Sequence, residues 1–568
     1  MTAEAGVPRA RRRARALLAA ALVAGTVAAY APALGAGFVW DDDDYVTENP
    51  LLHEPDGLRR IWLSADAPSQ YFPLTYTTFR IEYALWELEP LGYHLVNVLL
   101  HAANALLLWW VLVRLGLPAA WLAAAIFALH PVQVESVAWI TERKNVLSLF
   151  LSLGSLLAWL RFTEPGARRP GPAYGTSLAL AALALTAKTT ACTLPAAQVL
   201  VLWARGRAVD ARRWLQIAPF LLLGLAMGGV SLLWERTHQG TVGERFALAP
   251  LESLLVATRA VWFYLGKLVW PVDLTFSYPK FSVDPSDPLQ YGWLVAGAIL
   301  VLGLWAARGR IGRWPLAAAV FFVATLSPVL GFVPLFTFFY SHVADHYQYV
   351  ACIGPIALAA GVGATLLERS GRAPWRARYV LAGVLLVALG GLTYQQSRIY
   401  ESRETLWRDT VAKHPASWMG HTNLGRELMR QRRFEEATAS YRAALEVRPD
   451  LHGPHRGLAL ASLRLGRQDD ALAHLGRALE LKPDFYAAHK DMAHLRARRG
   501  ELPEAFAHYR EMVAIAPNNP EGFFLMGRAL EKRSRLQEAR NQYRRVLQID
   551  PDHKGARRAL TILQAHGD

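Results

Sequence analysis

Long apolar runs, separated by short polar and basic segments, occupy the chain up to about residue 395. A helix needs about 20 consecutive apolar residues to cross the hydrocarbon core of a bilayer. The pattern predicts eleven such spans, the first beginning near Leu17 and ending near Val39. It therefore predicts an all-α polytopic membrane bundle for residues 1–395. The other ten spans are expected near 93–113, 118–134, 146–161, 174–188, 190–204, 214–234, 291–307, 314–331, 346–366 and 378–395.

The stretch 251–270 is also long enough to cross a bilayer, but its charges are gathered on one side. Glu252, Arg259 and Lys267 fall within about a third of a helical wheel, with the apolar side chains largely elsewhere. We interpret this stretch as an amphipathic helix lying in the outer interface of the membrane. An ordinary span whose two cations snorkel to the surface is the alternative.

Basic clusters between the apolar runs predict the orientation of the bundle. Residues 9–15 read RARRRAR, and the positive-inside rule keeps such a segment in the cytoplasm. Eleven crossings put the later arginine clusters on the same side, and they make residues 38–92 the first external loop and the C-terminus external. The basic start followed by an apolar run also fits a secretory signal, but the run is long and more spans follow, so we expect an uncleaved anchor.

A regular repeat with a period of about 34 residues governs the C-terminal third of the chain. Small residues recur at two positions of this period, where two helices would touch, and a proline closes each unit. This pattern is typical of tetratricopeptide repeats (TPRs), in which each repeat is a pair of helices. The prolines are Pro415, Pro449, Pro483, Pro517 and Pro551. We expect a linker helix over 396–416, repeats over 417–450, 451–484, 485–518 and 519–552, and a capping helix over 553–566.

Composition supports a membrane protein with a soluble tail. The 568 residues are 53% hydrophobic, with a mean hydropathy of +0.16, and the apolar excess lies before Tyr394. The net charge of +15 would suit a nucleic-acid partner, but much of it lies in turns between spans, so we predict no nucleic-acid partner. Only Cys192 and Cys352 occur, which excludes a disulfide framework and a cysteine-based metal site.

The stretch from Phe38 to Pro50, FVWDDDDYVTENP, carries the candidate chemistry. Its four aspartates follow the first predicted span, so their carboxylates are expected at the external membrane surface. Like charges close together raise the pKa of a carboxyl group, which makes it a better general base. Asp41 and Asp42 are our catalytic candidates. A solvated helix end is one alternative, and a divalent metal held by Asp41 and Asp42 is another, because hard cations prefer carboxylate oxygens.

The second external loop, His130–Asn145, supplies candidate cations. Arg143 offers a bidentate fork to a phosphate and Lys144 a point charge, so both are predicted to bind a donor phosphate. An exposed loop of mixed charge is the alternative. Lys188 lies between two short apolar runs with little room to reach the surface, and we assign it to the same phosphate. It equally fits the tip of an external hairpin.

A third polar group opens the tenth predicted span from the outside. It comprises Asp345, His346 and Tyr347. Together with Glu135 of the second loop, these residues are predicted to orient the substrate, since a histidine beside a carboxylate can hold an acceptor or a phosphate. Capping of the helix start, with a ring at the membrane interface, explains the three residues equally well.

The chain resembles the C-superfamily (GT-C) membrane glycosyltransferases that are fused to TPRs, such as the transmembrane-and-TPR O-mannosyltransferases of animals and their bacterial relatives. The resemblance covers essentially the whole chain. It is carried by FVWDDDDYVTENP from 38, YFPLTYTTFRIEYALWELEPLGYHLVNVLLHAANALLLW from 71, FALHPVQVESVAWITERKNVLS from 127, AKTTACTLPA from 187, WPVDLTFSYP from 270 and ADHYQYVACIG from 344.

The resemblance implies a GT-C bundle and an inverting transfer of a sugar, a mannose-like hexose, from a polyprenyl-phosphate donor to a protein hydroxyl on the external face. The family's acidic pair follows an aromatic residue, which maps onto Asp41 and Asp42. The implied partners are the lipid-linked sugar, membrane lipid, and a protein or peptide acceptor recruited by the TPRs. Ala, Arg and Leu richness suggests a bacterial inner membrane. A catalytically silent, membrane-anchored TPR scaffold is the alternative function.

Overall fold

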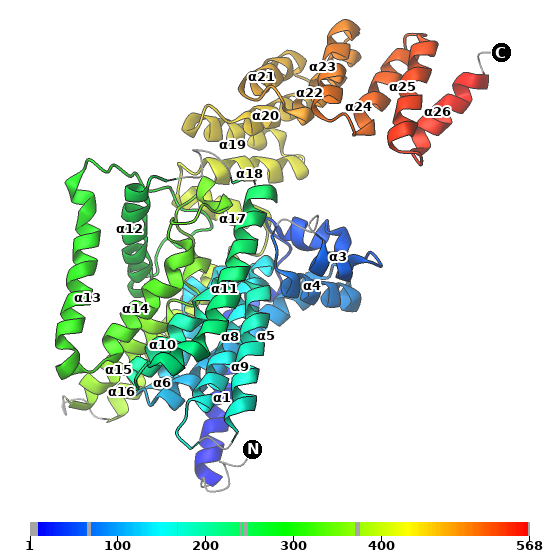
Figure 1. The fold of residues 1–568 in the computed structure, drawn as a ribbon. Coiled ribbons are helices and arrows are strands. Elements are labelled where there is room, and N and C mark those ends of the chain that lie inside the picture. The colour runs from blue at the N-terminus through cyan, green and yellow to red at the C-terminus, as the bar shows by residue number, and fades with distance from the viewer. Residues whose placement is uncertain are drawn as a thin grey trace. The chain divides into compact units, whose positions relative to one another are not determined.

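The chain is helical throughout the parts that its structure describes. The computed structural model covers residues 9–64, 70–166, 169–238, 240–241, 248–369 and 375–565 (Figure 1). Helices account for 78% of the chain, and these residues contain no strand. The chain divides into two compact units, residues 1–414 and 415–568. The predicted all-α class and the C-terminal TPR solenoid are confirmed.

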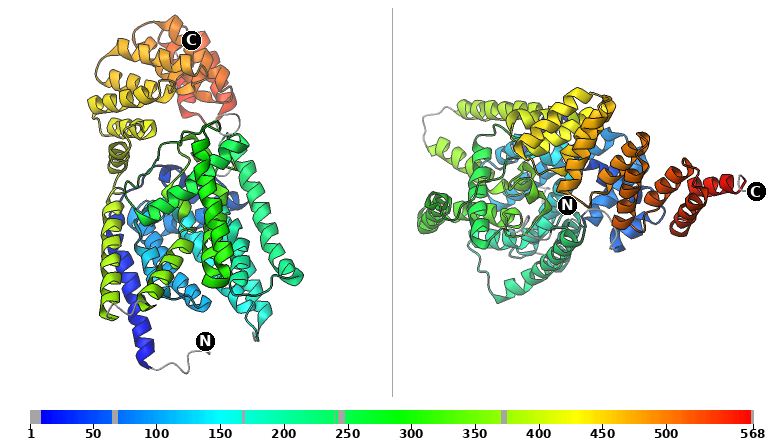
Figure 2. Two further views of the ribbon diagram at one scale, coloured as in Figure 1. Left: turned by 90° about the vertical axis from the view of Figure 1, so that its left-hand side faces the viewer. Right: turned by 90° about the horizontal axis from the view of Figure 1, so that it is seen from above.

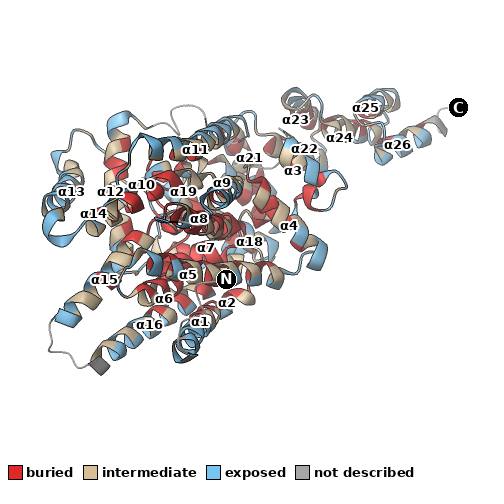
Figure 3. Cartoon of the chain, turned by 60° about the horizontal axis from the view of Figure 1, so that its bottom comes forward, coloured by how far each residue is buried: buried red, intermediate tan, exposed pale blue. Residues whose placement is uncertain are grey.

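The first unit is a bundle of long helices that run side by side (Figure 2). Its centre is α8 (Arg143–Phe162), against which α5 (Pro90–Leu115) and α9 (Pro170–Ala187) pack, and buried residues concentrate around these elements (Figure 3). The other helices of the bundle include α1 (Arg9–Ala29), α6 (Ala120–Leu129), α10 (Leu194–Ala204), α11 (Ala211–His238), α12 (Pro250–Val269), α13 (Gly292–Ile311), α14 (Trp314–Leu326), α15 (Ile353–Arg369) and α16 (Trp375–Arg398).

The expected count of eleven spans is not confirmed. Within the described residues, five helices are long and apolar enough to cross a membrane, and a sixth results if α6 and the bent segment after it count as one. Several predicted spans fall on helices that are too short, such as α6, α10 and α14 with 10, 11 and 13 residues. Short 3-10 turns interrupt the apolar runs there, and a run of hydropathy does not reveal such a break. The five helical segments are Pro90–Leu115, Ile140–Phe162, Ala211–His238, Pro288–Ile311 and Ala377–Arg398.

The amphipathic stretch 251–270 forms the single helix α12. Leu255, Val256, Ala260 and Tyr264 are buried along one side of it, as an amphipathic helix requires. The helix is not among the segments apolar enough to cross a membrane. Its location in the outer interface stays a prediction.

The segment between α6 and α8 folds inward instead of forming an exposed loop. It consists of a 3-10 turn (Pro131–Gln133), the short helix α7 (Val134–Ala138) and a second 3-10 turn (Ile140–Glu142). Every residue from His130 to Val146 is buried. The polar side chains of this segment therefore face partners inside the bundle, and an exposed loop of mixed charge does not describe it.

The second unit consists of four helix pairs, one within each predicted repeat, and a last helix. Glycine is required where paired helices touch: a Cβ at Gly425 would lie 2.7 Å from the ring of Tyr441, and one at Gly527 would lie 2.7 Å from Tyr543. Residue 566 of the predicted capping helix lies outside the described residues. The helices are α18 (Trp418–Arg430), α19 (Phe434–Val447), α20 (His452–Arg464), α21 (Gln468–Leu481), α22 (Tyr486–Arg498), α23 (Leu502–Ile515), α24 (Pro520–Glu531), α25 (Leu536–Ile549) and α26 (Lys554–Ala565).

Candidate active site

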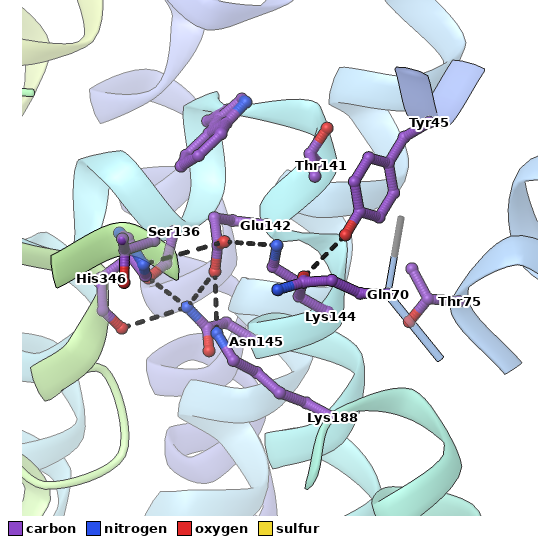
Figure 4. Close-up of polar contacts among 12 residues, drawn as sticks. Tyr45, Gln70, Thr75, Ser136, Thr141, Glu142, Lys144, Asn145, Lys188 and His346 are labelled. Carbon is purple, nitrogen blue, oxygen red and sulfur yellow. Dashed lines mark hydrogen bonds and ion pairs between the residues drawn. The ribbon is translucent and has the colours of Figure 1, made fainter. Parts of the chain in front are cut away.

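A buried carboxylate, Glu142, forms the centre of a charged cluster at the start of α8 (Figure 4). The Nζ atom of Lys144 lies 3.0 Å from its Oε1 and that of Lys188 lies 3.1 Å from its Oε2, so two ammonium groups share one carboxylate. Asn145 Nδ2 also donates to Oε2, at 2.5 Å. Two ammonium groups thus lie beside one carboxylate, an arrangement in which a further anion can be bound.

His346 brings a distant part of the chain to the same cluster. It lies on the 3-10 turn Asp345–Gln348, and its Nδ1 is 3.1 Å from Oε1 of Glu135 on α7. Its backbone N donates to the other oxygen of Glu135 at 2.8 Å, and its Nε2 lies 3.9 Å from Glu142 Oε1. The imidazole therefore stands between two carboxylates, and the structure brings Glu135 and His346 together, as the sequence predicted for a common site.

Asp42 is fully buried and fully hydrogen-bonded. Its Oδ1 accepts from the backbone N of Thr141 at 2.9 Å and from the hydroxyl of the same residue at 2.6 Å, and its Oδ2 accepts from Val39 N at 2.8 Å. Burial raises the pKa of Asp42 to about 7, against the effect of these hydrogen bonds. Because each of its oxygens accepts at least one of these hydrogen bonds, Asp42 holds the turn that carries Glu142 in place.

Asp41 has the opposite surroundings. Its Oδ1 is buried without a hydrogen-bond partner among the described residues. Burial raises the pKa of Asp41 to about 8, and the charge of Lys144 opposes that rise. A carboxyl group with an unpartnered oxygen and a pKa near the working pH is suited to accept a proton from a substrate.

Aromatic rings surround Lys144. Its Nζ lies 5.1 Å from the ring centre of Tyr45, 5.9 Å from Phe72 and 5.8 Å from Trp139, within cation–π range of all three. The Tyr45 hydroxyl donates to Oε1 of Gln70 at 2.7 Å (Figure 4). The rings hold the ammonium group in a site largely shielded from water, where its electrostatic interactions are weakened less than in solvent.

Arg143 points away from this cluster, although it is adjacent to Lys144 in sequence. Its NH1 donates to Oε1 of Glu82 at 2.6 Å, its NH2 to the carbonyl of Tyr93 at 2.9 Å, and its Nε to Oδ1 of Asn97. The side chain is fully buried. Arg143 therefore joins α8 to α4 (Pro73–Trp86) and α5, and its donors are occupied instead of facing a phosphate.

Asp345 and Tyr347 lie beside His346 but turn to other partners. The Tyr278 hydroxyl donates to the carboxylate of Asp345, lying 3.0 and 3.1 Å from its two oxygens, and burial raises the pKa of Asp345 well above its ordinary value. The Tyr347 hydroxyl lies 2.5 Å from Oγ1 of Thr337. Of the three predicted residues in this turn, only His346 enters the cluster around Glu142.

Among the residues that the structure describes, no group of three or more His, Cys, Asp or Glu side chains is arranged to hold a metal ion. The two ammonium groups beside Glu142 occupy the positions that a cation would need.

Sequence reasoning missed Glu142 and Asn145 as members of the site. Both lie in the motif ITERKN, within the segment His130–Asn145 that the sequence predicts to be an external loop. The apolar residues before them, in VESVAWI, were the available signal that this loop is buried, because a solvated loop is seldom so apolar.

An apolar cavity of about 520 Å³ adjoins the cluster. Asn145 and Thr190 lie at one part of its lining, and Arg310 and Arg369 also line it, from the ends of α13 and α15. Along α8 the lining residues recur every three or four positions from Asn145 to Leu156, which is one face of the helix over about 16 Å. Most of the other lining residues are leucine, valine or alanine, many of them on α5, α10, α14 and α15.

Comparison with known proteins supports both halves of the sequence interpretation. Family models described as tetratricopeptide repeat match residues 394–452, 422–484 and 456–520, and a second such model matches 520–553. Solved repeat proteins that are similar include MamA, with 17% identity and a TM-score of 0.25 over 26% of this chain and 81% of that one. Another is YrrB, titled a TPR protein with an unusual peptide-binding site, with 18% identity and a TM-score of 0.26 over 35% of this chain and 97% of that one.

The membrane unit and the repeats together are similar to proteins named protein O-mannosyl-transferase. F38B6.6 of Caenorhabditis elegans is 22% identical over 75% of this chain and 62% of its own length. Tmtc1 of Drosophila melanogaster is 26% identical over 74% of this chain and 60% of its own, and human TMTC1 is 27% identical over 76% and 55%. The predicted resemblance to TPR-containing O-mannosyltransferases is confirmed. The chain matches only about 60% of the length of these relatives.

Proposed function

We propose that this protein is a membrane glycosyltransferase that moves a sugar from a polyprenyl-phosphate donor to a hydroxyl group of a protein. The observation that carries the proposal is the pair Lys144 and Lys188 on one buried carboxylate, with Asp41 facing Lys144 and an apolar cavity adjoining. The similarity to proteins named O-mannosyl-transferase supports the reaction class and favours a mannose-like hexose.

The two ends of a lipid-linked donor have different requirements, and neighbouring parts of the site suit each of them. A polyprenyl chain needs an apolar channel, which the leucine-rich cavity supplies. Its phosphate needs cations that are not already neutralised, and Lys144 and Lys188 outnumber the carboxylate between them. Asn145 both lines the cavity and donates to Glu142, so phosphate binding is assigned to this junction and not to Arg143.

The transfer uses Asp41 as the general base. The carboxylate takes the proton of the acceptor hydroxyl while the hydroxyl oxygen attacks the anomeric carbon of the sugar from the side opposite the phosphate. The bond from that carbon to the phosphate oxygen breaks, and the electron pair leaves with the polyprenyl phosphate, whose charge the lysines balance. General-base help contributes about 10²- to 10⁴-fold in rate, and the remainder comes from positioning and electrostatic stabilisation.

The TPR unit supplies the acceptor. Stacked helix pairs form an extended surface of the kind that binds peptides, so the repeats recruit or orient the protein that receives the sugar. We place the reaction on the external face of a bacterial inner membrane, with the N-terminus in the cytoplasm, from the distribution of the basic turns.

The test uses the full-length protein in lipid nanodiscs with radiolabelled polyprenyl-phosphate mannose, and membranes of the expression host as acceptor. Label should enter protein with the wild type, and Asp41→Asn should lose at least about 100-fold in rate. Asp44→Asn is the matched control, because Asp44 is exposed on the same stretch, and it should keep its rate. If Asp41→Asn transfers at the wild-type rate, Asp41 is not the base. If the wild type transfers no label and still captures the same host proteins through its repeats, the protein is a scaffold.

A further inference from the structure

The helix α17 (Arg403–Lys413) packs against the aspartate stretch of the membrane unit. The guanidinium group of Arg403 forms an ion pair with Asp43, and each side chain is only 21% exposed. The ring of Trp407 lies 5.2 Å from that of Trp40, centre to centre. The two contacted residues, Trp40 and Asp43, lie immediately before and after Asp41 and Asp42 in the sequence.

The backbone that α17 contacts is strained. Trp40 has φ of +49°, a left-handed conformation that a bulky side chain rarely adopts. Such a residue keeps its conformation only when its surroundings hold it. Here the Trp40 ring is held among Trp407, Phe276 and Tyr340, at 5.2, 6.0 and 6.2 Å between ring centres. The left-handed turn immediately precedes Asp41, so its conformation decides where the carboxyl group points.

The sequence of α17 continues the pattern of the repeats one period towards the N-terminus. Trp407 lies one repeat length before Tyr441, the aromatic residue of the second helix in the first repeat. Pro415 precedes Pro449 by the same interval. The first TPR match likewise begins at residue 394, ahead of α17. By its sequence, α17 thus occupies the position of the second helix of a repeat. Its contacts nevertheless assign it to the membrane unit.

We propose that α17 is a repeat helix that positions the catalytic aspartate of the membrane unit. Arg403 holds the stretch through Asp43, and Trp407 holds Trp40 in its left-handed turn, so both are positioning residues for Asp41. This gives Asp43 a role distinct from those of its two neighbours. The inference rests on the proposed function for its catalytic part, whereas the fastening of the stretch by α17 is independent of any activity.

The first experiment measures amide hydrogen exchange of the full-length protein in nanodiscs. Arg403→Gln should raise exchange of the amides in residues 38–49 about tenfold, because a fastened segment becomes free to open. Arg408→Gln is the matched control, since Arg408 lies on the same helix and pairs with Glu404 instead. Trp407→Leu should show a larger increase; if it does not fold, Arg403→Gln alone decides. Unchanged exchange in Arg403→Gln overturns the proposal.

The second experiment measures transfer with the same variants. Arg403→Gln should lower kcat about tenfold and change KM for the lipid-linked sugar less than about twofold, because donor contacts stay intact while the base is misplaced. Arg403→Lys should restore most of the rate, since it keeps the charge beside Asp43. Faster exchange with an unchanged kcat overturns the positioning role. A wild type without transfer activity overturns the proposed function instead, and the exchange result still decides whether α17 fastens the stretch.

Discussion

Charged residues of the repeats and of the membrane bundle form ion pairs of two different kinds. In the repeats, pairs such as Arg477 with Glu480 and Arg535 with Glu538 are three residues apart along the chain and largely exposed. In the bundle, Glu142 pairs with Lys188, 46 residues away; Glu142 is buried and the Lys188 side chain is only 12% exposed. Exposed pairs contribute little to stability, whereas buried charges cost several kcal/mol of desolvation each. A bundle that keeps buried charges at that cost has a use for them other than folding.

Breaking a buried pair should give the largest effect. Arg143→Gln leaves Glu82 buried without its cation, and we expect a loss of about 3–5 kcal/mol in the free energy of unfolding. Arg477→Gln, which removes an exposed pair of the repeats, should change it by less than about 1 kcal/mol. Thermal unfolding of the full-length protein in detergent measures both. Equal effects from the two substitutions would contradict the contrast between the units.

Substitutions of the two adjacent aspartates should have opposite effects. Asp42→Asn should mainly lower stability, and Asp41→Asn should mainly lower transfer activity. Asp42→Asn puts an amide NH₂ toward a backbone or hydroxyl donor, and we expect a loss of about 1.5–3 kcal/mol. Asp41→Asn should cost less than about 1 kcal/mol, because its buried oxygen has no hydrogen bond to lose. It should nevertheless abolish transfer. Stability and transfer assays on the same preparations check this, and a larger destabilisation by Asp41→Asn would contradict it.

Close helix packing in the repeats can be tested with a matched pair of glycines. Gly425→Ala would put a methyl group 2.7 Å from the ring of Tyr441, so we expect a loss of about 1–3 kcal/mol. Gly453→Ala meets nothing within 4 Å on α20 and should stabilise the helix slightly, by about 0.5–1 kcal/mol. Unfolding of the repeats by urea measures both. A neutral Gly425→Ala would show that the ring moves aside.

The last prediction concerns the pH dependence of transfer. The base must be deprotonated, and the pKa of Asp41 is raised to about 8, so the rate should rise about tenfold per pH unit below 8 and level off above it. Because the folded pKa lies above the unfolded one, the protonated carboxyl favours the folded state, and this contribution is lost as the pH rises through 8. Rates measured from pH 6 to 9 check the profile. A rate that is flat below pH 8 would exclude Asp41 as the base.

The repeats could be predicted almost completely from sequence, because each of their contacts recurs locally. Gly425 and Tyr441 meet within one helix pair, and the same pair of positions recurs as Gly527 and Tyr543. A fixed period along the chain carries all of this information. The spans could be predicted less well, since a 3-10 turn inside an apolar run leaves no trace in hydropathy.

Several residues that the sequence assigns to one candidate site lie together in the structure, but their different surroundings could not be predicted. Asp41 and Asp42 are equivalent along the chain, and only Thr141, 99 residues away from Asp42, distinguishes them. Arg143 and Lys144 are adjacent cations, and only the position of Glu82 separates their functions. Long-range contacts decide each role, and a single sequence contains no record of them.

The two lysines beside Glu142 have a consequence for the proposed reaction. Its donor would be a phosphodiester with a single negative charge, whereas the polyprenyl phosphate left behind would be a monoester with a charge between about −1.5 and −2 at neutral pH. Two lysines on one carboxylate hold the more negative species more tightly. In the proposed reaction the spent carrier should therefore compete with the donor for this site and inhibit transfer.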